Sequence, residues 1–329
     1  MEQRRSGRQK CSKGGEKLIR ISQLKLPITH TKAQLEKKIA KTLKNPGNSF
    51  TYEIKKQSLD CRHKNDKIFV YTVDVTIRDE QKLAKKVNNN SIMLTKEKPY
   101  EFPSPGETPL LHSPVIVGSG PAGLFCGWYL AKAGYCPIIL ERGEEAEKRQ
   151  KTVENFWKNG VLDPESNVQF GEGGAGTFSD GKLNTLVKDP YGRNHEVLKR
   201  FVAAGAPEEI IYQQKPHLGT DVLVGIVEKM RHEIEEMGGK FCFRSKVTDL
   251  IFENSTLKEI EINNDKRIPA QVCVLAPGHS ARDTFEMLQK RGVYMEPKSF
   301  AVGLRIEHPQ EMINMDLYGE PENELLGAA

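Results

Sequence analysis

The sequence predicts an α/β protein in which a small α+β domain precedes a three-layer domain, built on a parallel sheet with an antiparallel meander. Three features of the 329-residue chain indicate this organisation. The charge changes sign along the chain, a proline-rich stretch separates the two parts, and strand and helix patterns alternate regularly only after that stretch. The hydrophobic share of 37% and the charged share of 28% are ordinary for soluble domains.

Basic residues are concentrated in the first part of the chain. Up to Thr95 there are 22 Lys and Arg against 9 Asp and Glu, and since the whole chain has a net charge of +5, residues 96–329 carry −8. A basic surface can contact RNA or another polyanion, whereas a lysine-rich surface can equally be a well-solvated one. Both interpretations stay open, and the solvated surface is the simpler.

Residues 17–95 predict a ferredoxin-like α+β domain in the order β-α-β-β-α. Thr31 and Gln34 form a capping-box pattern at the start of its first helix. This arrangement hosts many functions and assigns none by itself. Residues 1–16 are basic without the apolar stretch of a signal peptide, which predicts a disordered arm. The strands are expected at 17–26, 50–59 and 67–77, and the helices at 29–43 and 79–87.

A connector is predicted over residues 96–113, because five prolines between positions 99 and 114 favour an extended chain. The three-layer domain should then occupy residues 114–298. It includes an amphipathic helix over 220–239, capped by Thr220 or Asp221 and ended by glycines. Further strands are expected between 241 and 278, and residues 299–329 should begin an incomplete substrate domain with a strand.

The turn Gly-Ser-Gly-Pro-Ala-Gly carries the pattern that binds the pyrophosphate of a dinucleotide in Rossmann-like domains. Gly118 would make the tight turn after the strand, with Ser119 beside it. Gly120 would let the backbone approach the pyrophosphate, and Gly123 would let the helix pack closely on the sheet. At Pro121 and Ala122 the helix N-terminus would direct its free N–H groups at the phosphates.

A carboxylate stands where a dinucleotide ribose would lie. Glu141 ends the next strand, 23 residues after Gly118, and can accept hydrogen bonds from ribose hydroxyls. It disfavours a 2′-phosphate and therefore NADP. Arg142 could contact the same ribose. Because strand, helix, strand and terminal acid are all in place, a plain βαβ unit is the lesser alternative.

A second glycine-rich stretch, residues 171–185, contains a near-match to a triphosphate loop. Gly176 to Lys182 reads Gly-x-x-x-x-Gly-Lys, but Leu183 replaces the Ser or Thr that would hold magnesium, and no buried strand precedes it. We therefore expect a different role, in which glycines allow close backbone approach to a cofactor. The candidates are Gly173, Gly174, Ala175 and Gly176 for the backbone, and Thr177, Ser179, Asp180 and Lys182 for side chains.

The Pro-Ala-Gly ending of the first turn and the Glu-Arg-Gly after the second strand resemble the FAD-binding domain of glutathione-reductase-like flavoproteins. In those proteins a later strand ends in a small-residue turn that returns to the cofactor. Val272 to Leu275, followed by Ala276 and Gly278, has this form. Val247 resembles the valine that approaches the adenine.

Five longer segments resemble bacterial FAD-dependent dehydrogenases, usually described as NAD(P)/FAD-dependent oxidoreductases, from about residue 17 onward. The resemblance implies bound FAD, transfer of hydride or electrons through it, a small-molecule substrate and NAD(P)H as a candidate donor. Lys182 could then lie near the flavin and stabilise its reduced, anionic ring, and an exposed lysine is the equal alternative. Proteins of this kind continue further, so we expect a C-terminally truncated chain. The segments are 57–64, 70–75, 167–185, 215–223 and 299–310.

The remaining candidates have plainer interpretations. His217 and His279 could face the site, although a lone histidine is more often structural. A solvated helix face is the simpler account of Arg149. An RNA-associated flavoprotein is an alternative function. Its only support is that Phe69 and Tyr71 weakly resemble the paired aromatic residues of an RNA-recognition module. An inactive fragment is another.

Cysteine spacing and hydropathy argue against dithiol enzymes, structural zinc proteins and membrane-spanning proteins. The six cysteines are scattered without a Cys-x-x-Cys pair, so neither a dithiol mechanism nor a structural zinc is expected, and a reduced cytoplasmic protein is the simplest account. No metal-ligand cluster is apparent. No apolar run approaches the ~20 residues of a membrane span.

Overall fold

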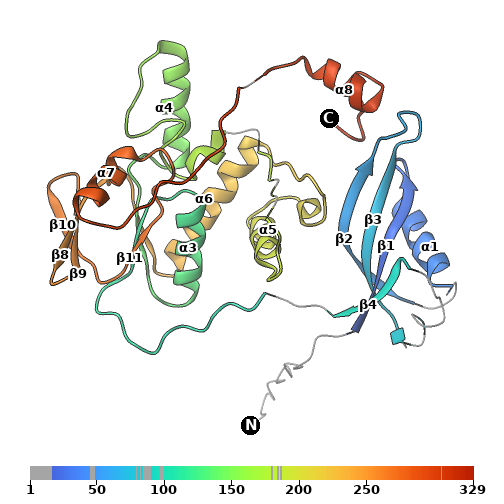
Figure 1. Cartoon of the computed structure of the whole chain (residues 1–329), viewed down its shortest axis with the longest axis horizontal. Coiled ribbons are helices and arrows are strands. Elements are labelled where there is room, and N and C mark those ends of the chain that lie inside the picture. The colour runs from blue at the N-terminus through green and yellow to red at the C-terminus, as the bar shows by residue number, and fades with distance from the viewer. Residues whose placement is uncertain are drawn as a thin grey trace, which may run out of the picture.

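The chain forms two bodies with separate hydrophobic cores, joined by an extended connector (Figure 1). The arm predicted for residues 1–16 and most of the helix predicted for 79–87 lie outside the described residues. The computed structural model describes residues 17–44, 49–78, 80–81, 83, 90–96, 100–178, 181–183, 185, 187–304 and 306–329.

The N-terminal body is a four-stranded antiparallel sheet in the order β2-β3-β1-β4, which is the order of a ferredoxin-like sheet and agrees with the β-α-β-β-α succession that the sequence predicted. The short edge strand β4 was not predicted, because its five residues are half-exposed and show little alternation. The elements are β1 (Lys17–Pro27), α1 (Lys32–Thr42), β2 (Thr51–Asp60), β3 (Ile68–Thr76) and β4 (Ile92–Lys96).

Helix α1 forms where its capping box predicts. The Gln34 N–H donates to Thr31 Oγ1 at 3.3 Å, and the Thr31 N–H donates to Gln34 Oε1 at 2.7 Å, so two N–H groups of the first turn are satisfied. Leu35 and Ile39 face the sheet and are buried. Tyr71 belongs to the same core at 4% exposure, so the aromatic echo on β3 does not present this ring for stacking on a base.

The second body is built on a parallel sheet in the order β11-β5-β6-β7. Alternation along β5 divides its side chains between two layers. Ile116 packs with α3 and α6 on one face, whereas Val115 and Val117 pack with the antiparallel meander on the other. The elements are β5 (Val115–Val117), α3 (Pro121–Lys132), β6 (Ile138–Leu140), α6 (Thr220–Glu236), β7 (Lys240–Cys242) and β11 (Cys273–Leu275).

The meander and the remaining helices complete three layers, as predicted. The meander has the order β10-β9-β8. Helix α6 begins after Gly219 without a side-chain cap, so the predicted caps at Thr220 and Asp221 are wrong, whereas Gly238 ends the helix in the left-handed conformation. The elements are α4 (Ala146–Asn159), α5 (Arg193–Ala203), β8 (Val247–Glu253), β9 (Thr256–Ile262), β10 (Lys266–Pro269), α7 (Arg282–Lys290) and α8 (Gln310–Tyr318).

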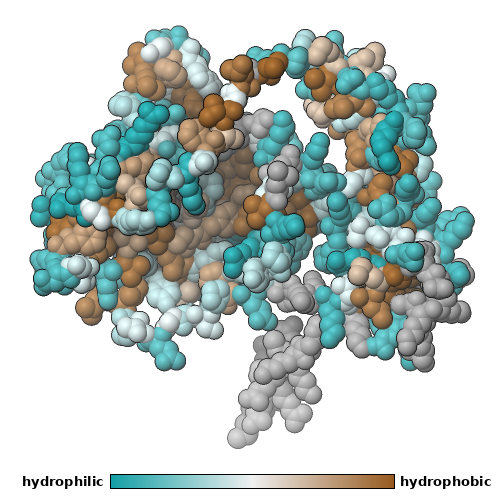
Figure 2. Space-filling model, in the orientation of Figure 1, coloured by the Kyte–Doolittle hydropathy of each residue, from teal (hydrophilic) through white to brown (hydrophobic). Residues whose placement is uncertain are grey.

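The strand predicted at the start of residues 299–329 is not formed in the part of this segment that the structure describes. The alternating apolar residues are there, but no neighbouring strand offers backbone partners, so the chain stays irregular until α8. Phe300, Val302 and Leu304 are 83–96% exposed. Figure 2 shows apolar side chains along this stretch, which leads from the second body toward α8.

The two bodies meet at the edge of β2. The Gln57 N–H donates to the Tyr212 carbonyl at 2.7 Å, and the Gln214 N–H donates to the Gln57 carbonyl at 3.0 Å. Residues 212–214 therefore extend the N-terminal sheet by a short parallel bridge.

The capping box gives a test of how α1 is stabilised. Replacing Thr31 by Ala should cost about 1 kcal/mol, because the N–H of Gln34 loses the side-chain acceptor of the capping box. Hydrogen exchange of the α1 amides should then accelerate about fivefold. Thr42→Ala is the matched control, since the Thr42 hydroxyl bonds only the Lys38 carbonyl in the last turn. Equal exchange rates in Thr31→Ala and the unmutated chain would contradict the assignment.

Candidate nucleotide-binding site

A cavity of about 450 Å³ opens at the carboxyl ends of β5, β6 and β11. This edge of a parallel sheet is where α/β proteins bind ligands, and the volume suits a small molecule or cofactor. Its lining comes from the turn after each of the three strands, from the glycine-rich segment 169–176, and from the segments that enter β8 and α7.

Two of the fingerprint glycines are required by packing. Gly118 has φ +98°, and a Cβ there would lie 2.4 Å from the Ala276 carbonyl oxygen. A Cβ on Gly123 would lie 1.9 Å from the Gly118 carbonyl oxygen. The tight turn and the close helix packing expected from the sequence are therefore both present.

The cavity floor is made where two glycine backbones approach each other. Gly120 caps α3, with Pro121 as the first helical residue, and a Cβ on Gly120 would have only the Gly174 Cα within 4 Å. The Gly173 N–H donates to the Ser119 carbonyl at 3.0 Å, which holds the two segments together. This cradle has room for a ligand that touches backbone and faces the N–H groups of a helix start.

The Glu141 carboxylate lies at the cavity wall and is 4% exposed. Its Oε2 accepts hydrogen bonds from the Ser119 N–H and hydroxyl, both at 2.8 Å, and its Oε1 accepts one from the Gly143 N–H at 2.9 Å. A carboxylate has about four acceptor sites, so one remains for a ligand hydroxyl. Ser119 thus orients Glu141 rather than facing the cavity.

Arg149 is fully buried under the glycine-rich segment, so the solvated helix face expected from the sequence is wrong. Its guanidinium donates to four backbone carbonyls and one hydroxyl at 2.7–3.0 Å. The sequence signal was its position on α4, three residues after Ala146 and four before Val153, which are both buried. The acceptors are the carbonyls of Asn167, Val168, Glu172 and Gly174 and the Thr177 hydroxyl.

The charge of Arg149 persists in this buried place. Burial lowers the pKa of its guanidinium to about 10, and the nearby carboxylates of Glu141 and Glu172 oppose that effect. The group is therefore cationic at neutral pH. Carbonyls at ordinary hydrogen-bond distance replace its hydration, which removes most of the cost of burying the charge.

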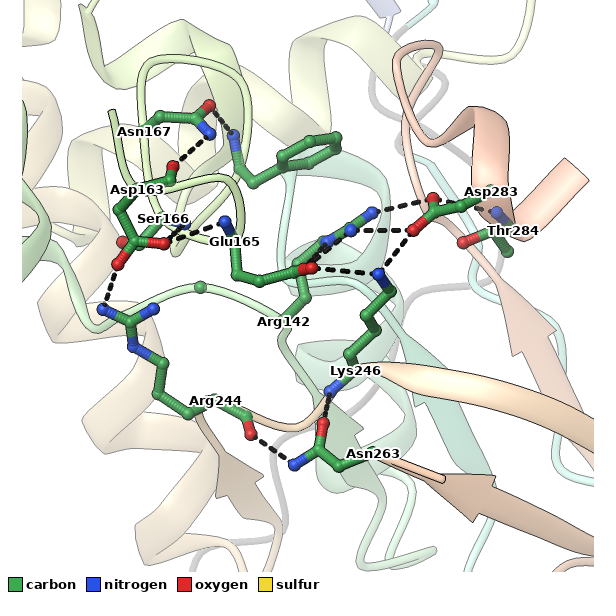
Figure 3. A network of polar contacts seen from close by, with 12 residues as sticks. Arg142, Asp163, Glu165, Ser166, Asn167, Arg244, Lys246, Asn263, Asp283 and Thr284 are labelled. Carbon is green, nitrogen blue, oxygen red and sulfur yellow. Dashed lines mark hydrogen bonds and ion pairs between the residues drawn. The ribbon is translucent and has the colours of Figure 1, made fainter. Parts of the chain in front are cut away.

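At the cavity rim, side chains from four segments form a ring of alternating charge (Figure 3). Arg142 contacts Glu165 and Asp283, and Lys246 contacts the same two carboxylates. The Arg142 guanidinium also lies over the Phe170 ring, 4.1 Å from its centroid. We call these four charged residues the rim ring.

Most of the residues expected at the cofactor line the cavity. Ser119, Gly123, Gly173 and Thr177 support it from behind, and Ser179 and Asp180 lie outside the described residues. The lining members of the expected set are Gly118, Gly120, Pro121, Ala122, Glu141, Arg142, Gly174, Ala175, Gly176, Val247, Ala276 and Gly278.

Lys182 does not line this cavity. It forms an antiparallel bridge with His217, next to backbone hydrogen bonds from Leu183 to Pro216 and from Leu218 to Gly181. A short 3₁₀ helix, η1 (Gly174–Phe178), lies within the glycine-rich stretch, and the described residues directly before it, 160–173, form no strand.

Several lining residues were missed by sequence reasoning. Phe170, Lys246 and Thr284 come from three segments that only folding brings together. Lys246 precedes Val247, which the sequence did single out. His279, considered as a candidate, lines the cavity, whereas His217 does not.

The part of the chain that the structure describes has none of the features of metal sites, disulfides or membrane-spanning helices. No group of three His, Cys, Asp or Glu side chains there could hold a metal ion. The cysteines at positions 61, 126, 136, 242 and 273 are free thiols. None of the described helices is both long and apolar enough to cross a membrane.

Comparison with known families agrees with the fold. Residues 116–151 match a family described as "NAD(P)-binding Rossmann-like domain", and residues 18–76 match a domain of unknown function, DUF8436. The fold and the glycine turn thus define a Rossmann-like nucleotide-binding domain, preceded by a ferredoxin-like one.

A protein of Clostridium beijerinckii, named only "Uncharacterized protein", is 45% identical over 306 residues. The match covers 93% of this chain and 57% of the relative, so the chain spans little more than half the relative's length.

Solved structures give weaker likenesses. Thermovibrio ammonificans THI4 matches with a TM-score of 0.37 and 21% identity, covering 55% of this chain and 62% of that one. L-proline dehydrogenase from P. horikoshii matches with a TM-score of 0.31 and 16% identity, covering 56% of each chain. Scores this low support no inference about a ligand.

The role of Arg149 can be tested by removing its charge and its donors. Arg149→Met should lower the free energy of unfolding by about 3 kcal/mol or more, because buried carbonyls lose their donors. Chemical denaturation measures this change. The control is Lys148→Met, which removes only an exposed surface ion pair with Glu145 and should leave the free energy of unfolding nearly unchanged. Similar losses of stability in the two variants would contradict the role of the Arg149 hydrogen bonds in holding the glycine-rich segment.

Proposed function

We propose that the cavity binds FAD and that the chain is the flavin-binding part of an oxidoreductase. The observation that carries the proposal is the glycine cradle, where Gly120 at the start of α3 faces Gly174 across the cavity floor. A pyrophosphate needs this close backbone approach and the positive end of a helix.

The rest of the cavity suits the adenosine half of a dinucleotide. Glu141 keeps one acceptor site for a ribose hydroxyl, as described above. Val247 lines the cavity at the start of β8, in the place where the resemblance to flavoproteins puts the adenine. These features fit any adenine dinucleotide, so they support FAD and NAD alike.

Two features favour FAD over NAD. The glycine-rich segment lines the cavity from Gly174 to Gly176, beyond the pyrophosphate turn, and Ala276 and Gly278 line it after a further strand. Both correspond to contacts that the resemblance implies for FAD. A flavin bound here would supply hydride and electron transfer, while the chain binds and orients it. The substrate would be a small molecule, with NAD(P)H as a candidate electron donor.

The absorbance spectrum of the gently purified chain tests the proposal. We expect flavin bands near ~450 nm, and FAD rather than FMN on release from the protein. A protein that is colourless and takes up no added FAD contradicts the proposal for this chain.

A glycine pair offers a sharper test of the cradle. Gly174→Ala places a Cβ 3.2 Å from the Gly120 Cα and the Pro121 Cδ, so the two backbones must separate and FAD affinity should fall at least about tenfold. Gly160→Ala is the control, because Gly160 has nearly the same φ, +70° against +67°, and nothing within 4 Å. Both variants lose about 1–2 kcal/mol of stability to the left-handed backbone. Titration with FAD compares their affinities, and equal affinity would contradict the cradle.

A further inference from the structure

We infer that the rim ring determines which adenosine the cavity accepts, and that it rejects an adenosine phosphorylated on the ribose 2′-oxygen. The inference rests on the proposed dinucleotide site. It extends that proposal from the kind of cofactor to the residues that set its specificity.

The N–H donors of Arg142 already form hydrogen bonds to carboxylates of the protein. Its Nε donates to Glu165 Oε2 at 2.7 Å, and its two Nη atoms donate to the two carboxylate oxygens of Asp283 at 3.0 and 2.9 Å. This is the paired, bidentate arrangement in which a guanidinium binds a carboxylate or a phosphate. A 2′-phosphate would need the same donors.

The Lys246 ammonium is committed to the same two carboxylates. It lies 2.9 Å from Glu165 Oε1 and 2.7 Å from Asp283 Oδ2. Arg142 and Lys246 both line the cavity, whereas Glu165 and Asp283 do not. Two cations therefore line the cavity, and their charges are balanced by Glu165 and Asp283, which lie outside its lining.

The local charge opposes a phosphate. The two cations of the rim ring face its two carboxylates, and Glu141 adds a third carboxylate at the cavity wall. Arg149 lies near Glu141 and offsets its charge, and Arg244 pairs with Glu144 and Asp163. The cations of the rim ring are already neutralised, so a 2′-phosphate would bring negative charge beside the carboxylates of the ring.

Asp283 and Lys246 both carry their charges at neutral pH. Burial raises the pKa of the Asp283 carboxyl, but hydrogen bonds from Arg142 and Lys246 outweigh that effect and hold this pKa well below its usual range. The same contacts raise the pKa of Lys246 against the effect of its burial.

Two neighbouring residues give opposite indications in the sequence, because Glu141 disfavours a 2′-phosphate whereas Arg142 taken alone favours one. An arginine near the ribose-binding acid is the residue that accommodates a 2′-phosphate in NADP sites. Arg142 directly follows Glu141, but Asp283 and Glu165, distant in sequence, occupy its donors. The discrimination therefore depends on the carboxylates that neutralise Arg142.

The test compares ADP-ribose with 2′-phospho-ADP-ribose by calorimetry on the full chain, freed of bound nucleotide. The unmutated chain should bind the phosphorylated ligand at least about tenfold more weakly. In Asp283→Asn the preference for the ligand without the 2′-phosphate should shrink at least about tenfold. The Nη groups of Arg142 lose their carboxylate partner there and become available to the phosphate. Glu165→Gln should shift it in the same direction.

Asp249→Asn is the matched control, since it breaks the Asp249–Arg291 pair near the end of α7, away from the cavity. It should leave the preference unchanged. The preference is a ratio measured within one protein, so a reduced folded fraction cancels. If Asp283→Asn does not fold, Glu165→Gln carries the test.

The outcomes separate the two proposals. Equal binding of both ligands by the unmutated chain, or an unchanged preference in the ring variants, overturns the role of the ring while the dinucleotide site stands. Binding of neither ligand overturns both proposals.

Discussion

The buried guanidinium of Arg149 is the contact on which the candidate site depends. Residues 167–173 have no regular secondary structure, so their carbonyls must find donors elsewhere. One side chain of α4 supplies five hydrogen bonds and gives this segment a fixed shape. A Cβ on Gly171 would lie 2.3 Å from the Arg149 Cδ, so the segment lies directly against the side chain. The approach of Gly174 to Gly120 follows from this packing.

The sequence predicted what local chemistry determines. Thr31 and Gln34 set the start of α1, alternating or continuous apolar residues indicated most of the strands, and the glycines of the turn after β5 set its geometry. The burial of Arg149 was missed because a charged residue on a polar helix is usually solvated. The prediction of a strand near Phe300 was wrong for a different reason, since alternation describes the faces of a strand but not the partner that it needs.

The rim ring shows a further limit of sequence reasoning. Its members lie after β6, in the loop after α4, before β8 and in the first turn of α7, over 142 positions of the chain. Read singly, Arg142 indicates an anion site and Asp283 a helix start. Contact between these side chains changes their expected roles, because each cation neutralises a carboxylate and its donors are then unavailable to a ligand.

The short bridge at Gln57 also matters beyond the N-terminal sheet. Residues 212–214 attach to β2, and only two residues later Pro216 accepts a hydrogen bond from Leu183. Two residues span at most about 7 Å, so almost no slack separates the attachment points. A displacement of the N-terminal sheet edge would therefore pull on the stretch from Gly181 to Leu183. The ferredoxin-like domain is mechanically coupled to the end of the glycine-rich region, although none of its described residues lines the cavity.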